Sequence, residues 1–289
     1  MASSTKNVKL GVCQVYFDGV DLGYTQGGVE VTVKTDTHKV NIDQFGKTTI
    51  NEYIMGRDVS AKVPLAETTL ENMVAIMPGT TLIQTGGTVA SGTITFATGA
   101  ASANDTVTVN GVTFTFKASP SSDYEVAPGT GAAGSAANLY AALVASTDPA
   151  VKACNYSLSG SVITVKYGSA LMYGTTGKQS AAGNSVTLAK NGTNITVSGA
   201  NLSGGADATS TSVSVATGIG SDLLGFAREL RFHPVNKGAG DVSEDFAIPL
   251  AATSGALNFA YKLENERIYN VEFMGYPNAA TGQLFTVGA

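Results

Sequence analysis

Alternating apolar and polar positions dominate the first eighty residues and predict a β-rich fold. Residues 12–17 and 29–34 alternate cleanly, as strands with one buried face do. Two polar but extended arms follow, at residues 35–42 and 48–63, on either side of a turn at residues 43–47. This pattern predicts a hairpin that is too long for one subunit to bury.

Helical spacing is strong at one place in this part of the chain. Thr68-Thr69-Leu70-Glu71 has the form of a capping box, apolar residues follow at i, i+3, i+4 and i+7, and Pro78-Gly79 ends the pattern. We therefore predict one helix, which covers one sheet. Alternation returns near the C-terminus and predicts four more strands, at residues 226–234, 245–250, 257–263 and 268–273.

The middle of the chain differs from its flanks in composition. Residues 88–217 contain five lysines and five acidic residues, whereas the flanks carry the net charge of -5. Glycine-rich stretches at residues 86–87 and 203–207 predict flexible joints. We therefore expect a discontinuous outer domain, residues 1–87 and 218–289, and an inserted domain, residues 88–217.

The inserted domain has its own secondary-structure signals. A hairpin at residues 106–117 turns at Asn110-Gly111, which is a strong type I′ signal. An alanine-rich helix is predicted at residues 135–146, and further strands at residues 161–167 and 194–197. The insert is therefore expected to be a small α+β domain.

Composition excludes several classes of function. The chain has 289 residues with 34 glycines, no tryptophan and only 13% charged residues, a profile of turn-rich β structure that argues against coiled coils. A net charge of -5 supplies no basic surface for tight nucleic-acid binding. Cys13 and Cys154 are too few for a disulfide framework. The longest nearly apolar run, residues 139–145, is too short to cross a bilayer, so no membrane insertion is expected.

Candidate chemistry is sparse. The chain has two histidines, His38 and His233, without a recognisable nucleophile motif, and both are expected to be structural. The acidic pairs Asp18 with Asp21 and Glu264 with Glu266 have spacings typical of turns and solvated strand faces. We therefore expect no enzyme, no metal site and no cofactor.

Two near matches to phosphate-binding loops have simpler interpretations. Residues 41–48 end in Gly46-Lys47-Thr48 but join two extended arms, so a hairpin tip is expected. Residues 129–134 match G-x-G-x-x-G and precede a helix, but no apolar strand comes before them. A flexible turn before the helix is the simpler prediction.

Three segments resemble major tail tube proteins of long-tailed bacteriophages. They are residues 15–29 (VYFDGVDLGYTQGGV), the long arm at residues 34–65, and residues 230–235 (LRFHPV). Within the insert, residues 104–117 and 192–199 resemble a domain that recurs as an insertion in phage tail proteins. The similarity spans about residues 8–79 and 218–289 of the outer domain.

The resemblance implies a structural virion protein with a β-sandwich or barrel and one flanking helix. It also implies rings of six subunits that stack into a tube for ejection of viral DNA, without specific binding of that DNA. The implied partners are other copies of the chain, a tape measure protein and a tail terminator, in a virion tail assembled in the host cytoplasm. The departure from shorter family members is the insert, whose role the resemblance leaves open.

Two sets of residues are the candidate sites. The polar positions of the alternating strands are expected to face the channel: Glu30, Thr32, Lys34, Asp36, Asp58, Ser60 and Lys62. A plain solvent-exposed sheet face would explain the same alternation. The apolar positions of the arm are expected to pack against other subunits: Ile42, Phe45, Ile50, Tyr53, Ile54 and Met55.

The insert is expected to project outwards, because it cannot fit inside a bore that admits a duplex. Inserted domains around the outside of the tube would clash with a contractile sheath, which favours a non-contractile tail. The Ser/Thr-rich surface of the insert suggests weak contacts with the host surface. A competing interpretation is a fibre or adhesin-like module that binds surfaces. Against it stands the absence of tryptophan for stacking on sugar rings.

Overall fold

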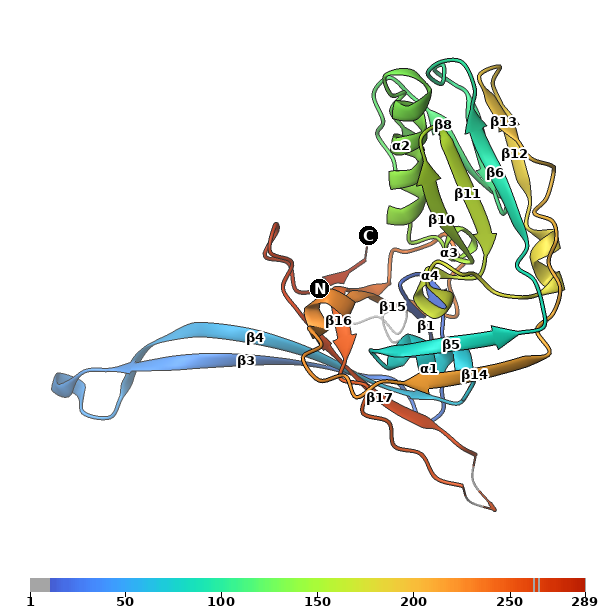
Figure 1. The fold of residues 1–289 in the computed structure, drawn as a ribbon. Coiled ribbons are helices and arrows are strands. Elements are labelled where there is room, and N and C mark those ends of the chain that lie inside the picture. Colours follow the sequence, from blue (N-terminus) through green and yellow to red (C-terminus); the bar gives the residue numbers. More distant parts are fainter. Residues whose placement is uncertain (1–10, 262, 265, 289) are drawn as a thin grey trace.

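The computed structural model describes residues 11–261, 263–264 and 266–288. Strands hold 42% of the residues and helices 15%, which confirms the predicted mainly β class. Figure 1 shows a body built on one large sheet, a long two-stranded arm that leaves it, and an inserted domain on another side of the body. The chain therefore has three visibly different parts.

The large sheet joins both ends of the chain. Its eight strands run in the order β2-β1-β15-β16-β17-β4-β3, with β18 paired to β16, and neighbouring strands are antiparallel. The strands are β1 (Cys13–Phe17), β2 (Val20–Asp21), β3 (Glu30–Asn41), β4 (Thr49–Leu65), β15 (Arg228–Pro234), β16 (Phe246–Thr253), β17 (Tyr269–Gly275) and β18 (Thr286–Val287). Inward-facing residues of these strands, including Val15, Val63, Leu230 and Phe273, form its core.

Two helices accompany this sheet, α1 (Leu70–Ile76) and the short α5 (Leu223–Phe226). The N-cap of α1 is Thr69, whose hydroxyl accepts the amide N–H of Asn72 at 3.1 Å. The helix thus begins one residue later than a capping box of Thr68 and Glu71 would require. Glu71 is free to contact the insert, while the Asn72 amide donates to the carbonyls of Leu22 and Glu67.

The insert has a separate hydrophobic core. Two four-stranded sheets, β10-β11-β6-β13 and β12-β7-β8-β9, pack with helix α2 (Gly131–Ala145). The strands are β6 (Ser91–Phe96), β7 (Thr106–Val109), β8 (Val112–Phe116), β9 (Glu125–Val126), β10 (Cys154–Ser159), β11 (Val162–Tyr167), β12 (Leu188–Asn191) and β13 (Ile195–Val197). Short helical segments are α3 (Pro149–Lys152), α4 (Ala170–Tyr173) and the 3-10 turn η3 (Ala181–Ser185).

The joints of the insert are paired strands, which corrects the expectation of flexible linkers. The incoming strand β5 (Thr80–Thr85) pairs along its whole length with the outgoing strand β14 (Ser210–Val215). Beyond them, Thr88 and Ala206 exchange backbone hydrogen bonds at 3.1 and 3.0 Å. Gly86 and Gly87 lie where a Cβ would collide with Thr209 and with the backbone of residues 206–208. These glycines therefore permit close packing of the two strands.

Helix α4 ties the insert to the outer domain. Its residues Met172 and Tyr173 are buried in the core of the large sheet, together with Ile76 of α1, and Leu171 packs beside them. On the other side, Lys152 of α3 donates to the Asp18 carboxylate at 3.0 Å, with both side chains largely buried. The insert is therefore anchored at several points besides its strand pair.

Two predicted elements differ in the structure. Residues 257–263 were expected to form a strand, but among the described residues of this segment the only pairing is an isolated bridge from Asn258 to Asn270. The alanine-rich helix begins at Gly131, four residues before the predicted start. The turn at Asn110 and Gly111 has the positive φ angles, 48° and 86°, that a type I′ hairpin requires.

Candidate functional site: the long hairpin

The strand register brings the predicted polar positions of β3 and β4 together on one face. Glu30 lies opposite Lys62, Thr32 opposite Ser60 and Lys34 opposite Asp58, while Asp36 lies opposite Gly56. Directly paired residues of an antiparallel ladder point to the same side, so the seven predicted side chains form one polar strip. Lys34 also lies 3.4 Å from the Asp36 carboxylate, with both groups exposed.

This polar strip continues onto the next strand. In β17, Glu272 lies opposite Lys62 and Asn270 opposite Pro64, and both side chains are exposed. The charged groups of the three-strand face are then four acids, Glu30, Asp36, Asp58 and Glu272, and two lysines, Lys34 and Lys62. The face is thus hydrated and mildly acidic.

The opposite side of the same strands is apolar and only partly covered. Val59, Ala61 and Val63 of β4 are fully buried in the core. Val31 and Val33 of the neighbouring strand β3 belong to the same side, yet remain 36% and 41% exposed. The outer edge of the sheet therefore leaves apolar surface that nothing within the described chain covers.

Beyond Gly56 the two strands continue as an isolated ribbon that projects from the body (Figure 1). Five of the six predicted arm residues are large and exposed, by 47% to 71%, and Ile42 is half-buried. The five are Phe45, Ile50, Tyr53, Ile54 and Met55. Residues 43–45 form the 3-10 turn η2 (Asp43–Phe45) at the tip, so the loop that resembles a phosphate site is a hairpin tip.

Two register shifts redirect the side chains of the arm. The first leaves Met55 unpaired between the pairs Asp36–Gly56 and Thr37–Ile54. The second leaves Ile50 unpaired between Val40–Asn51 and Asn41–Thr49. Because a bulge moves later residues to the other face, Ile54 shares the side of Val33, whereas Tyr53, opposite His38, lies on the polar side. The arm therefore offers apolar groups on both faces, which the sequence pattern alone does not reveal.

A groove of about 450 Å³ lies at the root of the arm. One wall is formed by Ile54, Met55 and Arg57 of β4, and the other by the C-terminal segment, with Pro277, Leu284 and Phe285. Phe285 is held by a stacked contact with Phe246 at 5.1 Å between ring centroids. We call these six wall residues the arm-root groove.

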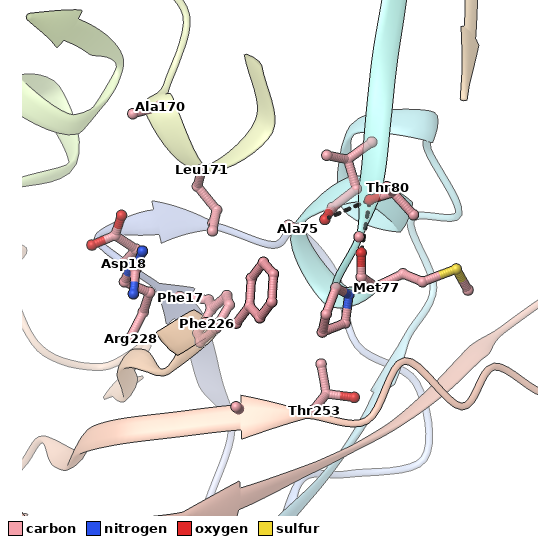
Figure 2. Close-up of a pocket in the computed structure, with 14 residues that line it drawn as sticks. Phe17, Asp18, Ala75, Met77, Thr80, Ala170, Leu171, Phe226, Arg228 and Thr253 are labelled. Carbon is pink, nitrogen blue, oxygen red and sulfur yellow. Dashed lines mark hydrogen bonds between the residues drawn. The ribbon is translucent and has the colours of Figure 1, made fainter. Parts of the chain in front are cut away.

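A smaller cavity of about 260 Å³ lies between α1, α4 and α5 (Figure 2). Leu171, Phe226 and Met77 supply much of its apolar lining. Its polar groups have partners: the Thr80 hydroxyl donates to the carbonyl of Met77 at 2.7 Å, and Arg228 donates to that of Ala227 at 2.7 Å. Asp18 is paired with Lys152, so the polar groups named here are already engaged by the protein itself.

The two histidines have different surroundings. His38 is exposed on the arm, whereas His233 is buried with its Nδ1 2.7 Å from the Asp245 carboxylate. Arg231 Nε lies 3.8 Å from the same carboxylate, and its guanidinium stacks 5.0 Å from the Tyr16 ring. This cluster joins β15 to the loop before β16, with no nucleophile in these contacts.

The other candidate residues also have structural roles. Asp21 accepts the Gly23 amide N–H at 2.9 Å, and Glu266 accepts from Gln26 at 3.1 Å. Across the described ranges, no group of three or more His, Cys, Asp or Glu side chains is placed to hold a metal ion. Cys13 and Cys154 are free thiols, and burial raises the pKa of Cys154 to about 12.

The glycine-rich turn before α2 is closely packed. Gly129 approaches the backbone of Gly134 so closely that a Cβ would collide with it. The buried Ser135 hydroxyl accepts the amide N–H of Ala101 at 2.9 Å and that of Gly129 at 3.3 Å. The turn is therefore a packed part of the insert, held by the side chain of Ser135.

Comparison with known proteins adds no identification. No protein-family model and no curated protein matches this chain. Within the described part of the chain, no helix combines the length and apolar character needed to span a bilayer.

Proposed function

We propose that this chain is the repeating subunit of a tail tube in a long-tailed, non-contractile bacteriophage. Copies of it form rings, six subunits in each as the resemblance implies, and the rings stack into a conduit for the viral DNA. Its further partners are a tape measure protein inside the tube and a terminator at its end. The protein thus acts in the virion tail after assembly in the host cytoplasm.

The observation that carries this proposal is the arm. An isolated two-stranded ribbon in water is marginal at best, and this one exposes Phe45, Ile50, Tyr53, Ile54 and Met55. Exposed apolar strands are an aggregation hazard unless another chain covers them. Assembly with neighbouring copies supplies that cover on both faces of the ribbon.

The polar strip beside the arm suits the wall of the conduit. Four acids and two lysines give it a mildly negative character, so phosphate groups are repelled and are not gripped. Cross-strand pairs such as Glu30 with Lys62 keep the wall hydrated, and their opposite charges limit the electrostatic potential at its surface. DNA then slides past without base-specific contacts.

The insert lies on another side of the body from the arm (Figure 1). In a ring whose strips face inwards, the insert belongs on the outside of the tube. Contacts through α4, Lys152 and the β5–β14 pair hold the insert against the outer domain, so each ring carries its inserted domains in fixed positions. Repetition along the tail would strengthen any weak contact with a host surface by avidity.

Electron microscopy of the purified full-length protein tests the proposal. We expect the purified protein to form rings or tubes of uniform bore. A monodisperse monomer at all concentrations would overturn the proposal and favour the surface-binding module. A sample of irregular aggregates without a bore would overturn it as well.

A further inference from the structure

A second protrusion leaves the body between β16 and β17, where the structure describes residues 254–261, 263–264 and 266–268, and it points away from the arm (Figure 1). Near its tip, the side chain of Leu263 is fully exposed and that of Tyr261 is 81% exposed. Glu264 follows directly and is also exposed. We call Tyr261, Leu263 and Glu264 the loop tip.

The base of this loop is held in place by Arg267. Its Nε and Nη2 donate to the Thr68 hydroxyl at 2.9 and 2.7 Å. Its guanidinium lies 5.4 Å from the ring of Tyr261 and 5.8 Å from those of Phe259 and Tyr269. Arg267 thus ties the base of the loop to the turn before α1, and it leaves the exposed side chain of Leu263 without a partner among these contacts.

The arm-root groove has the chemistry that this tip needs. Ile54 and Met55 on one wall and the half-buried pair Leu284 and Phe285 on the other are apolar, and the groove has room for more than one large side chain. Arg57 stands on its wall. Within the part of the chain that the structure describes, neither Arg57 nor Glu264 forms an ion pair. Each side chain can therefore pair with an oppositely charged group of another copy.

We propose that the loop tip of one copy docks in the arm-root groove of the next copy, with Leu263 between the apolar walls and Glu264 beside Arg57. Tip and groove lie on opposite sides of the body, so they meet only between chains. Such a head-to-tail contact is heterologous, and repetition of it closes a ring or extends a filament. The inference rests on the proposed function because it names one interface of the assembly.

Cysteine cross-linking tests the contact directly. In the full-length chain, Leu263→Cys combined with Leu284→Cys is expected to give a ladder of disulfide-linked oligomers on mild oxidation. The matched control combines Leu263→Cys with Val144→Cys on the exposed side of α2, 46% exposed in the wild type, and should stay largely uncross-linked. A ladder of equal yield in the control would reduce the result to random collision and overturn the proposal.

A charge exchange gives a second readout that leaves the apolar contact intact. Arg57→Glu and Glu264→Arg are each expected to raise the critical concentration for assembly at least threefold, and the double variant should restore it. Circular dichroism would establish that each variant is folded. Additive losses in the double variant would contradict the pairing of these two groups.

The outcomes separate this inference from the tube proposal. Tubes that form normally without tip–groove cross-links would overturn the inference and leave the tube standing. Cross-linked open filaments without a bore would support the tip–groove contact and overturn the tube. Cross-linking of the tip to the groove within single chains would overturn the head-to-tail arrangement.

Discussion

The Tyr173 hydroxyl of the insert donates a hydrogen bond to the Glu71 carboxylate of α1, 3.1 Å away. Lys178 approaches the same carboxylate at 3.5 Å and lies 5.7 Å from the centre of the Tyr173 ring. Burial and the nearby carboxylate both raise the pKa of Tyr173, so its phenol stays protonated and continues to donate. This polar contact lies beside the buried side chains of Met172 and Tyr173, through which the insert completes the hydrophobic core of the outer domain.

The first prediction follows from this contribution to the core. Met172→Ala should lower the free energy of unfolding of the full chain by about 2–4 kcal/mol, because a large buried side chain leaves a cavity. Val144→Ala, on the exposed side of α2, should change it by less than about 0.5 kcal/mol. Chemical denaturation measures both. An equal, small effect of the two substitutions would show that α4 is dispensable to the core.

A related prediction concerns removal of the insert. Replacing residues 86–209 with a two-residue Asn-Gly turn between Thr85 and Ser210, which keeps β5 paired with β14, should give tubes with the same bore and a smaller outer diameter. The variant should melt at a lower temperature than the full chain, because the surface beneath Met172 and Tyr173 becomes exposed. Calorimetry and electron microscopy measure the two effects. Density for the insert between rings in a map of the full chain would contradict its outward position.

The arm gives a prediction about assembly. Deleting residues 43–47 should leave a folded, soluble subunit that forms no tubes, because the ribbon then cannot reach its neighbours. The control, Asp43→Asn with Lys47→Gln, keeps the length of the arm and should still assemble. Sedimentation and microscopy of both variants measure the result. Normal tubes from the shortened chain would remove the arm from the assembly interface.

The polar strip gives a prediction about DNA transit. Changing Glu30, Asp36 and Asp58 to lysine should permit assembly but slow DNA ejection, because each ring then makes several phosphate contacts. The rate should recover at high salt. The control exchanges Lys34 and Asp58, which keeps the net charge, and should eject at the normal rate. Ejection of the triple variant at the wild-type rate in low salt would place these residues outside the lumen.

Glu229 of β15 gives a prediction about pH. Burial raises the pKa of its carboxyl above the ordinary value of 4.5, with Arg231 opposing that shift. The folded chain therefore holds this proton to a higher pH than the unfolded chain does, and stability falls as pH rises through that raised pKa. Glu229→Gln should remove this loss and melt at a higher temperature than the wild type at pH 8, with a smaller difference near pH 4.5.

The control for this pH prediction has the opposite sign. Hydrogen bonds from Ser121 lower the pKa of Glu125, so its ionised form stabilises the fold above pH 4.5 and the effect is lost as pH falls. Glu125→Gln should therefore lower the melting temperature at pH 8. Melting curves between pH 4 and pH 8 measure both variants. A lower melting temperature for Glu229→Gln at pH 8 would contradict the assigned effect of burial.

The sequence was most informative where the chain alternates strongly or turns sharply. Strands β1, β3 and β4, the turn at Asn110 and helix α1 all correspond to patterns visible in the residues. Strands β5 and β14 were missed, because TTLIQT and STSVSV carry so many Ser and Thr residues that they resemble linkers. Their pairing becomes visible only when both strands are seen side by side.

The candidate site was predictable to a smaller degree. The alternation of polar and apolar residues predicts that Glu30, Lys34, Asp58 and Lys62 share one polar face. The strand register of β3 and β4 places these residues opposite one another on that face. The unpaired positions of Met55 and Ile50 depend on which residues face each other across the ribbon, which alternation in one strand does not encode. The same holds for α4, whose four residues are too short for a helical period.

The pairing of β5 with β14 also bears on how a chain with this fold gains or exchanges an inserted domain during evolution. Since the two strands leave the outer domain side by side, from Thr85 and Ser210, any module whose own ends lie close together can be spliced at this point without rethreading the large sheet. A single contiguous replacement in the coding sequence is enough, provided that the newcomer supplies apolar side chains where Met172 and Tyr173 now lie. The β5–β14 pair is therefore a site at which recombination can exchange domains. It is also a practical place to display a foreign domain once on every subunit.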